Sequence, residues 1–140
     1  MFLVDVRLGR SPIHGWGVFA HARIPAGTRT WEFVPGVDQL LDPAAVAGAR
    51  DDLRSLLVHY TYLHPVLKKR VLCGDIAKFM NHSRTPSIRG TSAPDGGHDV
   101  AIRDIEIGEE LTVDYEEFHD ADLMAKMAGD TPLASGATEP

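Results

Sequence analysis

The chain has 140 residues, 44% of them hydrophobic and 24% charged, which is typical of one globular domain with its own core. Its net charge of −6 argues against a general nucleic-acid binder and suits a basic partner. The single cysteine, Cys73, excludes an internal disulfide and a cysteine-cluster zinc site.

No segment has the apolar core of a signal peptide, and no apolar run approaches the length of a membrane span. We therefore expect a cytoplasmic protein with no membrane partner. Arginine outnumbers lysine and alanine is abundant, which favours a bacterial source with a GC-rich genome. The small, polar residues 129–140 predict a disordered tail after a domain of residues 1–128.

Short strands dominate the N-terminal part of the chain. β-branched and aromatic residues predict strands over 2–7, 18–24 and 28–34, and the last two are separated by the turn Pro25-Ala26-Gly27. A helix follows, because Asp42 is a good N-cap residue and a proline comes directly after it. The helix is predicted to run to about residue 63, with apolar side chains at helical spacing: Leu53, Leu56, Leu57 and Tyr60. Gly48 weakens its start.

After this helix the pattern returns to short strands. They are predicted over residues 70–73, 87–91, 99–104 and 110–115, with one helical turn within 75–83 and a short helix over 120–128. Strands and helices do not alternate, so a parallel α/β fold is excluded. The fold class is mainly β, with one helical insert over about 42–64.

The segment GWGVFA, residues 15–20, fits the glycine fingerprint G-x-G-x-x-[G/A] of dinucleotide-binding folds. That fingerprint must open a helix of several turns, whereas here a turn and a β-branched stretch follow. Asp38 lies at the expected distance for a ribose-binding acid, but it sits in a loop. A nicotinamide dinucleotide is therefore disfavoured. By itself, the pattern is equally compatible with a tight turn that needs positive φ at glycine.

Three further segments resemble, together with residues 14–28, the SET-domain family of protein-lysine methyltransferases. They are GDIAKFMNHSRTPS (74–87), AIRDIEIGEELTVDYEEF (101–118) and YTYL (60–63), and the motifs follow that family's order. The resemblance covers about residues 3–118 and suggests a minimal, stand-alone protein of bacterial type. It implies several small sheets with a C-terminal pseudoknot, in which the last strand segment threads beneath a loop. It also implies S-adenosylmethionine in one pocket and a target lysine that enters from the opposite face.

Methyl transfer to an amine is an in-line displacement that needs a neutral amine, good alignment and little water. No covalent nucleophile is required, so the absence of a Ser-His-Asp arrangement is no objection. By the resemblance, Tyr115 is the catalytic residue: its hydroxyl would orient the amine and lie near the electron-poor methyl group. The alternative is a tyrosine buried at a strand end with a satisfied hydroxyl.

The resemblance also implies a set of cofactor-binding residues. Asn81 and His82 would bind the adenine and amino-acid portions, and the Asn81 side chain would tie the pseudoknot. Gly15 and Gly17 would let the backbone approach the cofactor's methionine part, and Trp16 would be its apolar wall. The remaining members of this set are Tyr60, Lys78, Phe79 and Phe118.

The lysine channel is expected to contain Tyr62, Val113 and Tyr115. Tyr60 and Tyr62 straddle the place where the family has a cofactor or channel tyrosine, and the sequence leaves open which of them faces the cofactor. Val113 is smaller than the family's usual aromatic residue two positions before the catalytic tyrosine. This favours multiple methylation.

The chain departs from the family pattern in the segment that follows His82. Arg84 replaces a cysteine that joins a zinc site in many histone-directed members, and no cysteines follow the domain, so we expect no metal. Another segment must then close the channel, and residues 118–127 are the candidates; the alternative is that they pack on the domain or fray. Ser87 in place of asparagine removes an amide that braces the loop. The histidines have no convincing metal spacing.

The function expected is an S-adenosylmethionine-dependent protein-lysine N-methyltransferase acting on a basic protein or peptide. One alternative is a catalytically weak SET-fold module that binds a basic partner; another is a methyltransferase for a small amine or for a ribosomal or nucleoid protein. The acidic residues crowded around Tyr115 either form a solvated face or attract a basic target segment. A homodimer would complete the peptide groove.

Overall fold

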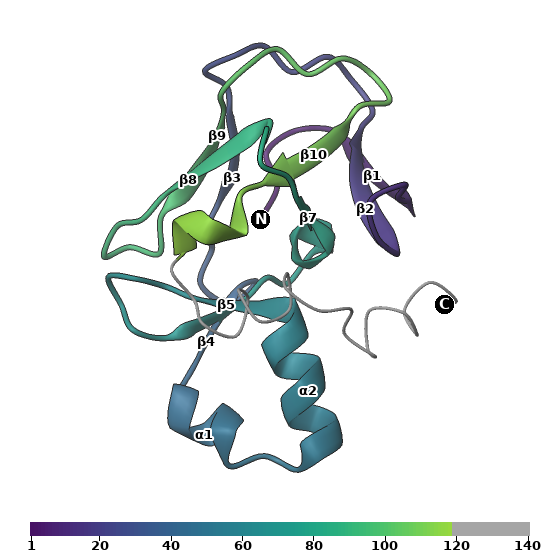
Figure 1. Ribbon diagram of the computed structural model, residues 1–140. Coiled ribbons are helices and arrows are strands. Elements are labelled where there is room, and N and C mark those ends of the chain that lie inside the picture. The colour runs from purple at the N-terminus through teal and green to yellow at the C-terminus, as the bar shows by residue number, and fades with distance from the viewer. Residues whose placement is uncertain (119–140) are drawn as a thin grey trace.

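Three small β-sheets and a projecting pair of helices make up the protein (Figure 1). The computed structural model describes residues 1–118. The sheets have the strand orders β1-β2-β10-β7, β3-β9-β8 and β4-β6-β5. The strands are β1 (Val6–Arg10), β2 (Trp16–Ala20), β3 (Arg29–Glu32), β4 (Gln39–Leu41), β5 (Thr61–Leu63), β6 (Arg70–Leu72), β7 (Asn81–His82), β8 (Ile88–Thr91), β9 (His98–Ala101) and β10 (Glu110–Val113). The helices are α1 (Pro43–Ala47), α2 (Asp51–Tyr60) and the 3-10 helices η1 (Ile76–Phe79) and η2 (Tyr115–Phe118).

Strand β10 pairs with strands from two earlier parts of the chain. It pairs antiparallel with β2, where Leu111 lies opposite Val18, and parallel with β7, where Thr112 lies opposite Asn81. The last strand is thus inserted between two earlier segments of the chain. This insertion brings the N-H-S segment beside the segment that leads into Tyr115.

The main hydrophobic core lies between the first two sheets. Ile24 and Ile105 form a reciprocal backbone bridge with N···O distances of 2.9 and 2.8 Å, and both side chains are buried. The other buried members of this core are Val18, Ala20, Ile88, Ala101, Leu111 and Val113. Each large aliphatic side chain buried here stabilises the fold by about 1.5–3 kcal/mol, so the core holds β10 firmly in place.

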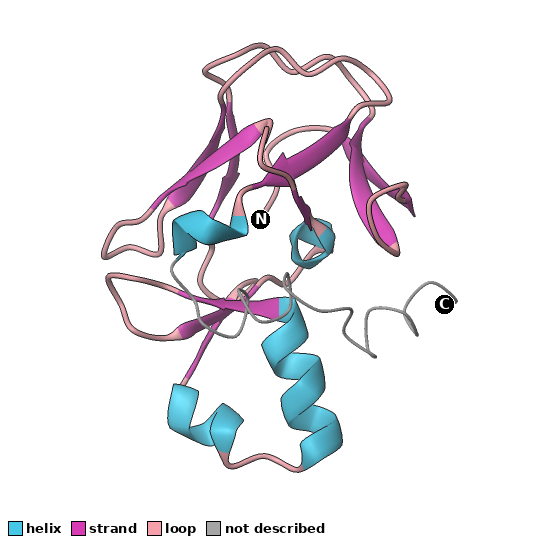
Figure 2. Cartoon of the chain, in the orientation of Figure 1, coloured by secondary structure: helices cyan, strands magenta, loops and turns pink. Residues whose placement is uncertain are grey.

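The helical insert begins as expected but is divided in two. The Asp42 carboxylate accepts a hydrogen bond from the amide of Ala44 at 3.0 Å, and Pro43 occupies the first turn. The prediction of one helix to residue 63 is wrong, because α1 ends at Gly48 and α2 starts at Asp51. Glycine has low helix propensity and ends helices readily. Helices α1 and α2 lie together at one end of the molecule, whereas η1 and η2 lie among the β-strands (Figure 2).

Three strand boundaries differ from the sequence prediction. The first strand runs over Val6–Arg10 and not over residues 2–7; Phe2 forms only an isolated bridge with Trp31. Residues 39–41, expected as loop, and 61–63, expected as helix, are the strands β4 and β5. Both pair with β6, one on each side. The reason is that β6 supplies hydrogen-bond partners that local propensity does not reveal. The helical turn within 75–83 is confirmed as η1, and the remaining strands are confirmed with shifted ends.

Candidate active site

Two clefts meet at Tyr115. The larger cleft holds about 590 Å³ of space open to solvent and is lined by Trp31, His59, Tyr60, Thr61, Tyr62, Cys73, Ala77, Lys78, Met80, Asp99, Val113 and Tyr115. The smaller cleft holds about 310 Å³ and is lined by His14, Gly15, Trp16, His59, Tyr60, Lys78, Phe79, Met80, Asn81 and Tyr115. The two share five residues, Tyr115 among them. A molecule in one cleft would therefore lie close to a molecule in the other.

The side-chain hydroxyl and the backbone amide of Tyr115 both donate hydrogen bonds. Its hydroxyl donates to the carbonyl oxygen of Met80 at 2.7 Å, and its amide donates to Nδ1 of His82 at 3.0 Å. The rings of Tyr115 and His82 lie 5.3 Å apart. Burial, with a smaller contribution from the negative charge of Glu110, raises the pKa of Tyr115 well above its ordinary value. Its hydroxyl is therefore protonated at neutral pH and acts as a hydrogen-bonding group rather than as a base.

Asn81 ties the N-terminal loop to β10. Its Nδ2 lies 3.0 Å from the carbonyl oxygen of His14, 2.9 Å from that of Trp16 and 2.9 Å from Oε2 of Glu110. The carboxylate of Glu110 in turn accepts from the hydroxyl of Ser11 at 2.8 Å. This network is largely shielded from water, and it fixes the loop of residues 14–16 against the central strand.

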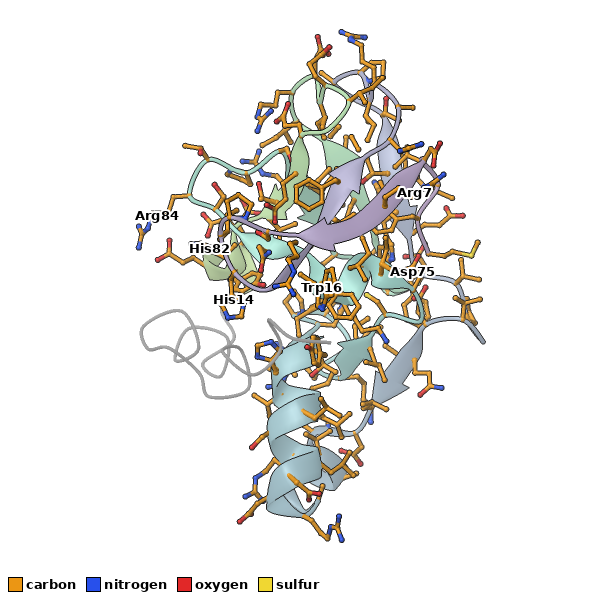
Figure 3. All side chains as sticks on the ribbon, turned by 90° about the vertical axis from the view of Figure 1, so that its right-hand side faces the viewer. Arg7, His14, Trp16, Asp75, His82 and Arg84 are labelled. Carbon is orange, nitrogen blue, oxygen red and sulfur yellow. The ribbon has the colours of Figure 1, made fainter. Side chains whose placement is uncertain are left out.

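Aromatic and polar side chains together form the walls of the smaller cleft. Tyr60 and Phe79 meet edge to face with ring centres 5.4 Å apart, and Trp16 forms a further part of the wall. Gly15 has a φ of 45°, which favours glycine, so the backbone turns there without a side chain. Nε2 of His14 is buried and has no hydrogen-bond partner among residues 1–118. His14, Trp16 and His82 lie close together on one side of the molecule (Figure 3).

The larger cleft is lined by buried polar groups as well as apolar ones. Val113, only 6% exposed, lines it together with Tyr62 and Cys73. Burial, with smaller contributions from the negative charges of Asp99 and Asp38, raises the pKa of Tyr62 well above its ordinary value. Burial also raises the pKa of the Cys73 thiol, so this cysteine is protonated and unreactive. Burial raises the pKa of Asp99 to about 7.

Most of the expected site residues come together. Six of the residues expected to bind cofactor line the smaller cleft: Gly15, Trp16, Tyr60, Lys78, Phe79 and Asn81. Tyr60 lines both clefts, whereas Tyr62 lines only the larger one, together with Val113 and Tyr115.

Two residues expected to bind cofactor, Gly17 and His82, are absent from the lining of both clefts. Gly17 does not line either cleft, and its free side faces Glu110. His82 accepts a hydrogen bond from the amide of Tyr115 through its Nδ1. Phe118 ends η2, and residues 119–127 lie outside the described residues, so the expected closure of the channel by 118–127 stays a prediction.

Several cleft residues were not singled out from the sequence. His14 and His59 line the smaller cleft, and Trp31 and Asp99 line the larger one. For Asp99 a signal existed: it lies two residues before the apolar Ala101 in a strand, so both side chains point to the same face.

Ser87 and Arg84, two residues that depart from the family pattern, each interact with another side chain. The buried Ser87 hydroxyl accepts from the amide of Thr112 at 3.1 Å, and the Ser87 amide lies 3.3 Å from the Thr112 hydroxyl, so serine also braces this loop. Arg84 points outward and pairs with Glu116 at 3.2 Å (Figure 3). Within residues 1–118, no three histidine, cysteine or acidic side chains gather as metal ligands, and no helix could cross a membrane.

Comparison with known proteins places these observations in one family. Residues 15–116 match the SET domain. The chain is 34% identical over 137 residues to an Aspergillus oryzae histone-lysine N-methyltransferase, H3 lysine-4 specific, covering 90% of this chain and 11% of that protein. It is 35% identical over 115 residues to the rice histone-lysine N-methyltransferase TRX1, covering 76% of this chain and 11% of that protein. The chain thus spans about a tenth of the length of these relatives.

The fold is shared more widely than the sequence. The structure of Chaetomium thermophilum Polycomb Repressive Complex 2 bound to GSK126 superimposes with a TM-score of 0.68 at 22% identity, over 89% of this chain and 17% of that one. The matched family covers the loop at Gly15, the N-H-S segment and the G-E-E-L segment before Tyr115. The chain belongs to the SET-domain family.

Proposed function

We propose that this protein is an S-adenosylmethionine-dependent protein-lysine N-methyltransferase. The observation that carries the proposal is the meeting of two clefts at Tyr115, one walled by aromatic rings and one reaching a buried valine and carboxylate. A transfer reaction between two bound molecules needs this geometry. The names of the curated relatives, which are histone-lysine methyltransferases, support the same reaction class.

The residues of the smaller cleft fit this cofactor. Aromatic walls suit its adenine and thioether parts, and the unpartnered Nε2 of His14 offers a buried polar group to a ligand. Gly15, Trp16 and Asn81 would hold the cofactor in this cleft. When bound, S-adenosylmethionine supplies a methyl group on a positively charged sulfur. A lysine side chain would reach it through the larger cleft.

Tyr115 would orient the substrate amine. Its hydroxyl is protonated and fixed by Met80, so it offers a stationary oxygen between the two clefts. Val113 leaves room beside it, which supports the proposal that more than one methyl group can be added. Because the Tyr115 hydroxyl does not ionise near neutral pH, it does not deprotonate the amine.

The substrate is proposed to be a lysine in a basic protein or peptide. The relatives' specificity for lysine 4 of histone H3 makes that peptide the first probe. Attraction by the acidic face is weaker than its composition suggests, because four of its carboxylates pair with arginines: Glu106 with Arg23, Glu109 with Arg103, Glu116 with Arg84 and Glu117 with Arg89. Cytoplasmic location, bacterial origin and a homodimer stay predictions.

The first test is calorimetric titration of S-adenosylmethionine into the wild type and Asn81→Ala, followed by methyl transfer to histone H3. We expect the wild type to bind and Asn81→Ala to lose binding. Tyr115→Phe should bind the cofactor as the wild type does, with transfer reduced at least about 100-fold. Thermal unfolding of each variant separates loss of binding from loss of fold.

Two outcomes would contradict the proposal. A well-folded wild type that does not bind the cofactor removes its basis. Cofactor binding without methyl transfer to histone H3, other basic proteins or small amines would favour the binding-module alternative, in which the SET fold holds a basic partner.

A further inference from the structure

We propose that Asp99 receives the positively charged amine of the substrate in the larger cleft and accepts its proton. The reaction that follows rests on the proposed function, whereas the binding of an ammonium group by Asp99 does not. Asp99 would be the base of this cleft, because Tyr115 is protonated and cannot accept a proton from the amine.

Asp99 lies in the middle strand of the second sheet. It pairs with Trp31 of β3 on one side and with Gly90 of β8 on the other. Its side chain shares a face with the buried Ala101 and lines the larger cleft together with Val113 and Tyr115. The carboxylate is thus built into a rigid strand and faces the space that the substrate amine would enter.

This carboxylate has no counter-ion among residues 1–118. No described side chain donates a hydrogen bond to it or lies within 4.0 Å as an ion pair. The ammonium of Met1 is near enough to lower its pKa slightly, but that group binds Asp38 at 2.9 Å and the carbonyl oxygen of Glu32 at 2.5 Å. Buried charges are normally paired, so an unpaired carboxylate in a cleft indicates a cationic ligand.

A second group in the same cleft is also without a partner. Trp31 is 2% exposed, and its indole Nε1 makes no hydrogen bond within the part of the chain that the structure describes. Trp31 and Asp99 are direct neighbours across two strands, yet the indole donor and the carboxylate acceptor do not satisfy each other. Buried polar groups in folded proteins are nearly always paired, so an unpaired indole N–H beside a half-buried cleft carboxylate points to a bound molecule.

The groups around Asp99 leave it suited to this role. Those that face it are Tyr62 of β5, Cys73 after β6, Asp38 and the Met1 ammonium, while His59, Lys78 and Tyr115 line the same cleft. The raised pKa values of Tyr62, Cys73 and Tyr115 keep these three protonated near neutral pH. Burial places the pKa of Asp99 at about 7, which suits a general base.

The proton step balances within the cleft. One N–H bond of the lysine ammonium breaks, and an O–H bond forms on the Asp99 carboxylate. The electron pair of the broken bond stays on nitrogen and becomes the lone pair that a displacement requires. The proton on Asp99 then leaves to the solvent that reaches the open cleft.

The test uses n-butylammonium chloride as a probe of the lysine head group and 1-butanol as its uncharged counterpart. Both are titrated at pH 8 into wild type, Asp99→Asn, Asp99→Glu and the control Asp52→Asn, with binding followed by NMR. Asp52 is an exposed residue of α2 that pairs with Arg50 away from both clefts. Wild type and Asp52→Asn should bind butylammonium at least about tenfold more tightly than butanol. Asp99→Asn should lose this preference, and Asp99→Glu should regain part of it.

A wild type with no preference for the charged probe would overturn the inference, as would an Asp99→Asn variant that keeps it. The second result would also indicate that the charge of Asp99 is not what holds the probe. If Asp99→Asn does not fold, the carboxyl carbon of Asp99 in the wild type serves instead. Butylammonium should lower its titration midpoint, and an unchanged midpoint would equally overturn the inference.

The activity measurement separates this inference from the proposed function. On the histone H3 peptide, Asp99→Asn should reduce kcat/KM about 10- to 100-fold at pH 7, with the difference closing as the pH rises and the amine loses its proton unaided. Transfer by the wild type that Asp99→Asn leaves unchanged at every pH would overturn the role of Asp99 alone. Asp99-dependent binding of butylammonium without any methyl transfer would overturn the proposed function alone.

Discussion

The side chain of Glu110 occupies the space that a side chain at residue 17 would need. A Cβ atom at residue 17 would lie 2.4 Å from Oε2 of Glu110 and 3.0 Å from Cβ of Ser11. This glycine therefore makes room for the carboxylate that holds Asn81 and Ser11. Its part in the structure is to allow β2 and β10 to approach with a polar network between them.

Gly17→Ala should lower the free energy of unfolding by about 1–3 kcal/mol, because the carboxylate of Glu110 must move out of a packed network. Urea unfolding measures the loss. The same change in a Glu110→Ala background should cost at least about 1 kcal/mol less, since the clash is then absent. Equal costs in both backgrounds would show that the clash with Glu110 is not the cause.

Asp99 makes stability depend on pH with a definite sign. In the unfolded chain its pKa is about 3.9, and burial raises it to about 7 in the folded protein. The folded state therefore binds the proton more tightly, and stability is lost as the pH rises from about 4 to about 7. Asp99→Asn cannot ionise and does not suffer this loss.

The stability gained by Asp99→Asn should therefore be near zero at pH 4 and about 1–2 kcal/mol at pH 8, allowing for solvent in the open cleft. Urea unfolding across this pH range, with Asp52→Asn as the control, measures it. A gain that is the same at both pH values would mean that Asp99 does not carry a raised pKa.

Helix α2 is the element that departs most from its sequence pattern. Its apolar residues recur at helical spacing, which predicts a buried face, yet none of its residues is buried and Leu53 and Leu56 are 46% and 42% exposed. It projects with α1 away from the sheets (Figure 1). The part that matters for the site is its C-terminal end, where His59 and Tyr60 reach both clefts.

Replacing Leu53 or Leu56 by serine should lower the free energy of unfolding by no more than about 1 kcal/mol, because neither residue belongs to the buried core. Ile88→Ala, in the fully buried core, should cost about 2–5 kcal/mol in the same thermal or urea experiment. A leucine variant that loses more than about 2 kcal/mol would show that this face of α2 is covered in solution.

The whole molecule is organised around β10. This strand contacts β2 and β7 on its two edges, packs on the main core and leads directly to Tyr115. Both clefts therefore depend on one central strand, whereas the helical pair is attached at the periphery.

Amide hydrogen exchange should reflect this organisation. The amides of Leu111 and Thr112 should exchange at the rate set by global unfolding, because opening them requires the central sheet to separate. The amides of α2 should exchange much faster through local opening, since no buried residue holds that helix. Equal protection of α2 and β10, measured by NMR, would contradict this hierarchy.

The local chemistry of the chain determined a good part of this picture. The N-cap at Asp42, the helical turn at η1 and the short strands around Val18 and Leu111 depend on neighbours within a few residues, so their patterns are visible in the sequence. Gly15, Trp16 and Asn81 of the smaller cleft were found because short motifs of fixed spacing carry them, whereas His14 and His59 were not. Such features are encoded locally by backbone preference and by side-chain periodicity.

Tertiary structure decided the features that depend on partners far along the chain. Strands β4 and β5 exist because β6 pairs with both, and Gly17 is needed because Glu110, 93 positions later in the sequence, occupies the space beside it. Asp99 becomes a site residue only when Trp31 and Tyr115 form the walls of its cleft. These outcomes depend on packing and desolvation between distant segments, which no short stretch of sequence contains.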